Sequence, residues 1–253
     1  MSGSESSLPP APPLTPRELA RLLPELTGEA AIRAGGVPTV IVPPGDWRPA
    51  GMRRRRQVSV VAEGLVAWRS AVVGGQSIAL TGPGDVLLPH GDPSGGPIPG
   101  ALAWRPLTHL RLAVLEERVL ASAGAELTEA LLASRGRAAA LQSLLAAATR
   151  IGRMDRRILT ILWLIAGRWG HADEDGLHGG LPLTQDVLAL VAGAHRSTVE
   201  DTIAAMLTEG RIRLDGDTLL LPAAQAQMLQ RAHMGLGDAD AATLQPVPAA
   251  ISG

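Results

Sequence analysis

The sequence contains no cysteine, lysine, asparagine, phenylalanine or tyrosine. Without cysteine there can be no disulfide, no thiolate-ligated zinc or iron–sulfur cluster, and no thiol nucleophile. All 23 basic residues are therefore arginine, and the aromatic residues are five tryptophans. This bias favours amino acids with GC-rich codons, which indicates a bacterium with a GC-rich genome.

Long apolar runs are also missing. No run approaches the ~20 residues that span a bilayer, and the stretch MSGSESSLPPAPPLTP is polar and proline-rich, unlike a secretion signal. We therefore expect a cytoplasmic protein without membrane contacts. A chain of 253 residues with 46% hydrophobic residues and a net charge of −1 can bury a sizeable core in one or two domains.

Three kinds of segment follow one another along the chain. Residues 36–115 hold short β-branched runs separated by Gly/Pro turns, such as VPTVIV, SIAL and LRLAVL, and this pattern predicts an all-β unit. Residues 113–151 are rich in alanine and leucine without proline, and predict a long helix. Residues 1–16 and 234–253 lack hydrophobic periodicity and predict poorly ordered tails.

The predicted long helix carries an apolar stripe with alternating spacings of four and three, as in a coiled coil. The stripe consists of Leu127, Leu131, Ser134, Ala138, Leu141, Leu145 and Ala148. Two interpretations are open: the stripe is the seam of a homodimer, or it packs on the β-unit of its own chain. We expect the dimer, although Gly136 disfavours a straight, strong helix.

Residues 154–222 predict a compact helical block. Its first helix places Ile158, Ile161, Leu162, Ile165 and Trp169 on one face. Thr184 is the expected N-cap of a second helix, and Gly193 is expected to end it. A third helix lies within GAHRSTVEDTI, and RIRLDGDTLLLP predicts a hairpin around Asp-Gly. Helix, short glycine turn and helix is the layout of a helix-turn-helix.

The stretch LTQDVLALVAGAHRSTVEDTIAAMLTEGRIRLDGDTLLL at 183–221 resembles the winged helix-turn-helix of the Crp/Fnr transcription regulators in order, spacing and turn glycine. The long helix before it and the turns at Gly64 and at Gly84-Asp85 match the rest of that architecture. The resemblance implies an α+β fold: a cupin-like antiparallel β-roll sensor over 17–122, a dimerisation helix over 123–152 and a winged helix-turn-helix over 153–233.

The resemblance also implies a homodimer that binds a near-palindromic operator in double-stranded DNA and works with RNA polymerase. Arg196 matches the arginine that grips a guanine through O6 and N7. Base contacts are expected from His195, Arg196, Ser197, Glu200 and Asp201, and phosphate contacts from Thr184, Gln185, Thr198, Arg211 and Arg213. Ser197 and Asp201 depart from the best-studied members and indicate a different operator.

The effector is left open by the sequence. Cyclic-nucleotide sites in the family use a Gly-Glu-Leu element and then an arginine, but this chain has Pro99-Gly100-Ala101 near the arginine position. We therefore expect that cyclic AMP is not a ligand and that no cofactor is bound. Haem ligation by His90 or His109 is disfavoured, because a lone histidine is more often a surface residue.

The predicted DNA-binding block is not basic. Residues 150–222 hold eight Arg against ten Asp plus Glu, a net of −2, whereas DNA-binding surfaces are usually basic. We expect the acidic groups Asp173, Glu174 and Asp175 to face away from DNA, and non-specific binding to be weak.

Their loop HADEDGLHGG also holds His171 and His178 but lacks the helical spacing of a zinc motif, so we predict a solvated connection without metal.

Other functional classes remain as alternatives. The main one is a cupin-like small-molecule binder or enzyme using His90, Asp92 and His109, in which the helical block makes protein contacts. Another is a regulator that acts mainly through protein partners. A triad of His195, Ser197 and Asp201 is disfavoured because side chains on one helix diverge. Residues 53–56, four arginines, are expected to form an exposed loop, and we expect no enzymatic activity.

Overall fold

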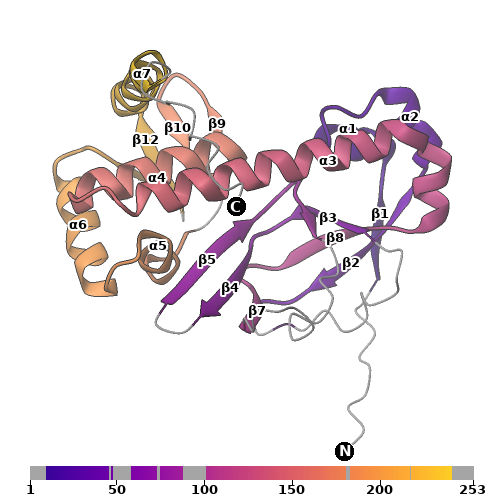
Figure 1. Cartoon of the computed structure of the whole chain (residues 1–253), viewed down its shortest axis with the longest axis horizontal. Coiled ribbons are helices and arrows are strands. Elements are labelled where there is room, and N and C mark those ends of the chain that lie inside the picture. Colours follow the sequence, from indigo (N-terminus) through magenta and orange to yellow (C-terminus); the bar gives the residue numbers. More distant parts are fainter. Residues whose placement is uncertain are drawn as a thin grey trace, which may run out of the picture.

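The computed structural model of the chain describes residues 10–45, 47, 58–72, 75–87, 101–180, 183–216 and 218–240 (Figure 1). Strands and short helices fill one end of the molecule, helices and a small sheet fill the other, and one long helix runs along both. No helix among these residues is long and apolar enough to cross a membrane.

The N-terminal unit is built from two antiparallel sheets, as the sequence predicts. The larger sheet has the order β1 (Pro10–Leu14), β2 (Val37–Val42), β8 (Leu110–Leu115), β3 (Val58–Glu63) and β6 (Val86–Leu87). The smaller sheet has the order β5 (Gly75–Thr81), β4 (Val66–Val72) and β7 (Ala101–Pro106). The predicted all-β unit is therefore confirmed, and β7 is an addition to the predicted strands.

The predicted tail over 1–16 is wrong from residue 10 onward. β1 pairs with β2 at the edge of the larger sheet, the position at which a strand tolerates prolines because one side needs no N–H donors. The carbonyl of Pro12 accepts hydrogen bonds from Thr39 Oγ1 (2.8 Å) and Arg111 Nη2 (2.9 Å). These side-chain donors fix a segment whose composition alone indicates a loop.

Two short helices follow β1. α1 (Pro16–Leu22) starts with a capping box, in which Thr15 and Glu18 satisfy each other's backbone N–H groups, and Pro16 occupies the first turn. α2 (Gly28–Ala34) is capped by Thr27. Leu19, Ala30 and Ala31 are fully buried in the core that these helices share with the larger sheet.

The predicted long helix is α3 (Glu117–Ala148), which is broken at Gly124 and not at Gly136. Gly124 has φ +71°, a left-handed conformation that favours glycine. Figure 1 shows the resulting bend, after which α3 runs from the β-unit to the helical block.

The stripe assigned to a dimer seam is buried within the chain, so that assignment is wrong. Its members Leu127 and Leu131 pack in the β-roll core. The members Leu141, Leu145 and Ala148 pack with the helical block. Ser134 Oγ donates to the carbonyl of Gly84 (2.6 Å), and Ala138 is half-buried. Spacings of four and three define a helical face, whatever covers it.

The C-terminal block contains the expected helices and the predicted hairpin around Asp-Gly, together with two further strands that the sequence did not predict. α4 (Met154–Trp169), α5 (Gln185–Ala192) and α6 (Arg196–Thr208) match the predicted helices. The four-stranded sheet has the order β11 (Arg213–Asp215), β12 (Thr218–Pro222), β10 (Gly176–His178) and β9 (His171–Ala172). Residues 171–180, predicted as a solvated connection, are exposed over 171–175 as expected but form a hairpin that extends the wing.

A last helix, α7 (Ala223–Asp240), overlaps the tail predicted over 234–253. It starts where the backbone N–H of Ala223 donates to the carbonyl of Asp175 (3.1 Å) and packs against α4, β10 and β12. The tail prediction is thus wrong for residues 234–240, while residues 241–253 lie outside the described part.

One hydrophobic core joins the two ends of the molecule. It contains Leu65, Ala67 and Leu80 from the β-unit together with Leu141 and Leu145 from α3. The faces predicted for α4, α5 and α6 enter the same core. Buried members are Ile158, Ile161, Leu162, Ile165, Val187, Leu188, Val191, Val199, Ile203 and Met206; Trp169 is partly buried against it.

Candidate nucleic-acid interface

The helix-turn-helix geometry agrees with the sequence prediction. The hydroxyl of Thr184 accepts the N–H of Val187, so Thr184 caps α5. Gly193 ends α5 in the left-handed conformation, with φ +61° and ψ +43°. The N–H of Ala194 then donates to the carbonyl of Ala189 (3.0 Å) and closes the turn. The chain can therefore enter α6 at once, with His195 as its N-cap residue.

The face of α6 that the core leaves free is polar. Val199, Ile203 and Met206 are buried, with exposed fractions of 5% or less. The expected base-contact residues lie on the other face: His195, Arg196, Ser197 and Asp201 are exposed, and Glu200 is half-buried. The structure thus brings these five residues onto one accessible helix surface.

Arg196 is held by two carboxylates. Its Nε donates to Glu200 Oε1 at 2.6 Å, and its Nη1 lies 3.2 Å from Asp186 Oδ1 on α5. The hydrogen bond that Arg196 donates to Glu200 and the charge of Asp186 raise the pKa of Arg196. The side chain remains 61% exposed, so solvent screens both pairs. A guanine would have to compete with Glu200 for this guanidinium.

The expected phosphate-contact residues differ in availability. Gln185, Thr198 and Arg213 are exposed, whereas the hydroxyl of Thr184 is engaged in capping. Arg211 Nη1 donates to Asp155 Oδ2 at 2.9 Å and ties the wing to the start of α4. Burial raises the pKa of Asp155, but hydrogen bonds from Arg211 and Arg153 outweigh it and lower the pKa to about 2. A phosphate contact by Arg211 would require breaking this pair.

The start of α6 faces the smaller sheet of the β-unit. A cavity of about 700 Å³ lies between them, lined by Arg69 and Arg105 on the sheet and by Thr184, His195 and Arg196 on the helical block. α5 also packs directly on β5. Arg196 and His195 therefore face the β-unit at the start of α6.

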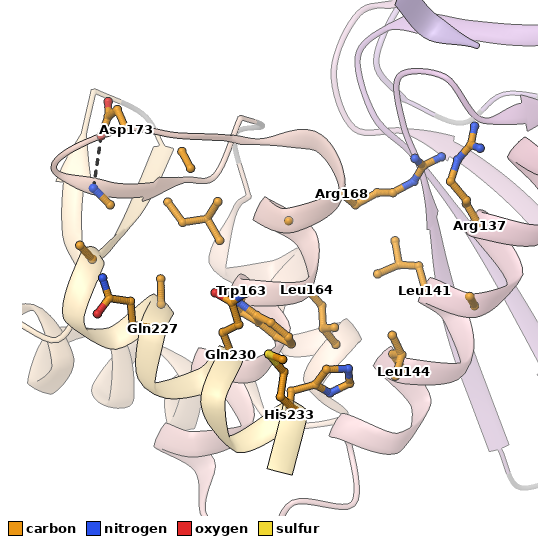
Figure 2. A pocket seen from close by; sticks show the side chains of 18 residues that line it. Arg137, Leu141, Leu144, Trp163, Leu164, Arg168, Asp173, Gln227, Gln230 and His233 are labelled. Atoms are coloured by element: carbon orange, nitrogen blue, oxygen red, sulfur yellow. Dashed lines mark hydrogen bonds between the residues drawn. The ribbon is translucent and has the colours of Figure 1, made fainter. Parts of the chain in front are cut away.

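A second cavity of about 820 Å³ lies between α3, α4 and α7 (Figure 2). Its walls are mainly apolar and include Leu141, Leu144 and Trp163. The ring centroids of Trp163 and of His233 on α7 lie 5.3 Å apart. The cations at its other end are already paired: Arg137 with Glu25, and Arg168 with Asp85.

The wing hairpin gathers residues that the sequence placed in a solvated loop. His178 pairs in register with His171, and their rings stack at 4.4 Å. His178 Nδ1 lies 2.7 Å from Asp215 Oδ2, and its Nε2 lies 2.9 Å from Asp173 Oδ2. The hydrogen bond to Asp215 and the adjacent carboxylate of Asp173 raise the pKa of His178. Asp215 was not singled out, because only the fold of the wing brings it to His178.

Some residues of the alternative functional interpretations lie outside the residues that the structure describes. His90, Asp92, Pro99-Gly100 and residues 53–56 lie outside it, and His109 is exposed. Among the described residues, no hydrogen bond joins His195, Ser197 and Asp201. The helix geometry therefore gives these three no triad.

No protein-family model and no curated protein sequence matches the chain. Solved structures do. A cyclic nucleotide-binding domain containing protein from Listeria monocytogenes has a TM-score of 0.57 at 16% identity, covering 80% of this chain and 97% of that chain. A CRP-family transcriptional regulator from Thermus thermophilus, TTHB099, has a TM-score of 0.52 at 17% identity, covering 75% and 93%. The chain has a Crp/Fnr-type fold.

A further similar structure is TTHA1359, a CRP/FNR-family transcriptional regulator from Thermus thermophilus. It has a TM-score of 0.50 at 23% identity, covering 76% of this chain and 98% of that chain. The resemblance predicted from residues 183–221 is thus confirmed as a fold: β-roll, long helix and winged helix-turn-helix occur in the expected order.

Proposed function

We propose that the protein is a sequence-specific, double-stranded DNA-binding transcription regulator of the Crp/Fnr type. The observation that carries the proposal is α6: its inner face is buried, and its outer face presents Arg196 beside His195 and Ser197 at the helix start. In a helix-turn-helix, this end of the second helix enters the major groove. Arg196 is then the main reader, through bidentate bonds to a guanine.

The proposed DNA contacts follow from exposure and charge. His195, Ser197, Glu200 and Asp201 would flank Arg196 at base edges, while Gln185, Thr184, Thr198 and Arg213 would meet phosphates. Asp201 and Glu200 add negative charge at the same surface. We therefore expect affinity to depend on matched base contacts more than on non-specific attraction.

The homodimer is proposed to form through the face of α3 opposite the buried stripe. This face is exposed and consists of small or apolar residues at spacings of three, four or seven: Ala125, Leu132, Gly136, Ala139 and Ser143. Leu132 is 63% exposed. A second copy of α3 fits such a face, because small residues let two helices approach closely and a two-fold axis pairs the face with itself. Two-fold symmetry then predicts a near-palindromic operator.

Binding of DNA requires the α6 start to leave the β-unit. In the present arrangement, Arg196 and His195 line the cavity shared with Arg69 and Arg105. We propose that this arrangement is the form with low DNA affinity. The effector that shifts it is not cyclic AMP in this proposal, no cofactor is required, and RNA polymerase is the expected partner at the promoter.

Selection of bound sequences from a random DNA pool tests the proposal on the full chain. We expect one enriched, near-palindromic motif with half-sites about one helical turn apart. Arg196→Ala should lose discrimination at a G·C pair, at a cost of ~1–3 kcal/mol. Arg118→Ala is the matched control, because Arg118 lies at the start of α3 and is 72% exposed. Absence of a motif, or an unchanged motif with Arg196→Ala, would overturn the proposal.

A further inference from the structure

The wing hairpin brings two imidazoles and a carboxylate together. His171 on β9 and His178 on β10 are cross-strand partners, and Asp173 lies in the turn between them. The ligand atoms of these three residues all lie within 4.8 Å of one another. Within the described chain they form the one such group of histidine and carboxylate side chains.

The side chain of Asp173 is fixed by hydrogen bonds within the turn. Its Oδ1 accepts the backbone N–H groups of Asp175 (2.9 Å) and Gly176 (3.2 Å), which fixes the carboxylate at the hairpin. Its Oδ2 is thereby directed at His178, 2.9 Å from Nε2. A preset carboxylate loses little freedom when it binds a cation.

The two nitrogens of His178 have different environments. Nδ1 lies 2.7 Å from Asp215 Oδ2 in a hydrogen bond. Nε2 is buried and has no hydrogen-bond partner of proper geometry, although Asp173 is near. Histidines that bind metal ions usually donate one ring N–H to a carboxylate and bind the metal through the other ring nitrogen. Nε2 is therefore the free ligand atom.

We infer that His171, Asp173 and His178 bind a divalent transition-metal ion, with Zn²⁺ as the best fit to two imidazoles and one carboxylate. Ligand atoms around a tetrahedral zinc lie about 3.3 Å apart, since the bonds are 2.0–2.1 Å. His171 is exposed and can rotate to close the site. Asp215 is a positioning residue for His178, and the fourth zinc position stays open to water or another ligand.

The site lies beside a proposed DNA contact. His178 is paired with Leu220 on β12, and Leu220 with Arg213 on β11, so the metal and Arg213 share one face of the wing sheet. A bound dication offsets the charge of Asp173 and Asp215 there. If the proposed DNA binding holds, on which this consequence rests, zinc strengthens the attraction of the wing to phosphates.

Competition with a zinc-sensitive fluorescent chelator tests the site on the full chain without a histidine tag or DNA. We expect one Zn²⁺ per chain, and at least a tenfold loss of affinity with His171→Ala or Asp173→Asn. Asp215→Ala should weaken binding 10- to 100-fold without removing a ligand. His233→Ala is the matched control with unchanged zinc affinity, because His233 does not belong to the cluster.

Two results would overturn the inference: no stoichiometric zinc binding, or binding that His171→Ala leaves intact. His171 is exposed, so its substitution should not unfold the wing, and circular dichroism checks this. DNA affinity measured with and without Zn²⁺ forms a separate arm. Zinc binding without any DNA binding would contradict the proposed function alone and leave the metal site standing.

Discussion

Asp85 in the β-unit accepts a hydrogen bond from Arg168 near the end of α4, so a buried ion pair connects the two ends of the molecule. Asp85 is 1% exposed, and Arg168 is 18% exposed. Burial raises the pKa of Asp85, while the N–H of Gly82 (3.0 Å) and Arg168 act in the opposite direction.

Removing one partner should therefore be costly. Asp85→Ala leaves the charge of Arg168 buried without a counter-ion, and we expect a loss of about 3 kcal/mol in the free energy of unfolding. Chemical denaturation measures it. Arg168→Met in the same background should restore part of the loss, because it removes the unpaired charge. Glu174→Ala, on the exposed hairpin, is the control with no change.

Acid should weaken the contact between α4 and the wing. The pKa of Asp155 is lowered to about 2 in the folded chain, from 3.8 when unperturbed. The resulting stabilisation is fully present above pH 3.8 and is lost as the pH falls toward 2. We expect the free energy of unfolding to fall by about 1–2 kcal/mol from this group, measured by urea unfolding between pH 6 and pH 2.5. Asp155→Asn should be less stable at pH 6 and lack this part of the pH dependence.

A charge on the exposed face of α3 should separate the proposed dimer. Leu132→Asp places a carboxylate in the self-paired surface, and we expect a folded monomer in sedimentation equilibrium. Ile32→Asp is a matched control, because Ile32 is a similarly exposed apolar residue (69%) that lies on α2 and not on α3. A wild-type chain that is monomeric at micromolar concentration would contradict the proposed dimer, as would a Leu132→Asp chain that remains dimeric.

Glu200 has two possible roles that one variant separates. If it only holds Arg196 in the free protein, Glu200→Gln frees the guanidinium and removes a negative charge, so DNA should bind several-fold more tightly. If Glu200 reads a base, the same variant should bind more weakly and lose preference at one position of the operator. Fluorescence anisotropy with the selected operator and single-base variants measures both. Glu29→Gln on α2 is the control.

The sequence predicted local structure well where the signal lies within one element. The cap at Thr184, the left-handed Gly193 and the buried stripe of α6 depend on neighbours along the chain, and all three were found. The capping box of Thr15 and Glu18 is a signal of the same local kind, and the prediction of a tail over 1–16 missed it.

Long-range pairing could not be predicted in the same way. The stripe containing Leu127 and Leu141 shows a buried face without saying whether a partner chain or the β-unit covers it. β9 and β10 are two and three residues long, too short for an alternating pattern. Only the pairing of β10 with β12, and of β12 with β11, brings His178 to Asp215 beside the proposed metal site.

The core shared by Leu80, Leu141 and the helical block has a thermodynamic consequence. Under the proposed function, freeing α6 for DNA would expose part of the apolar surface that this core buries, so DNA affinity and interdomain packing would be linked through one equilibrium. A substitution that weakens the packing, wherever it lies, should raise the affinity of the unliganded protein for its operator. Variants that bind DNA tightly without an effector are therefore expected to have substitutions in this shared core and not in α6.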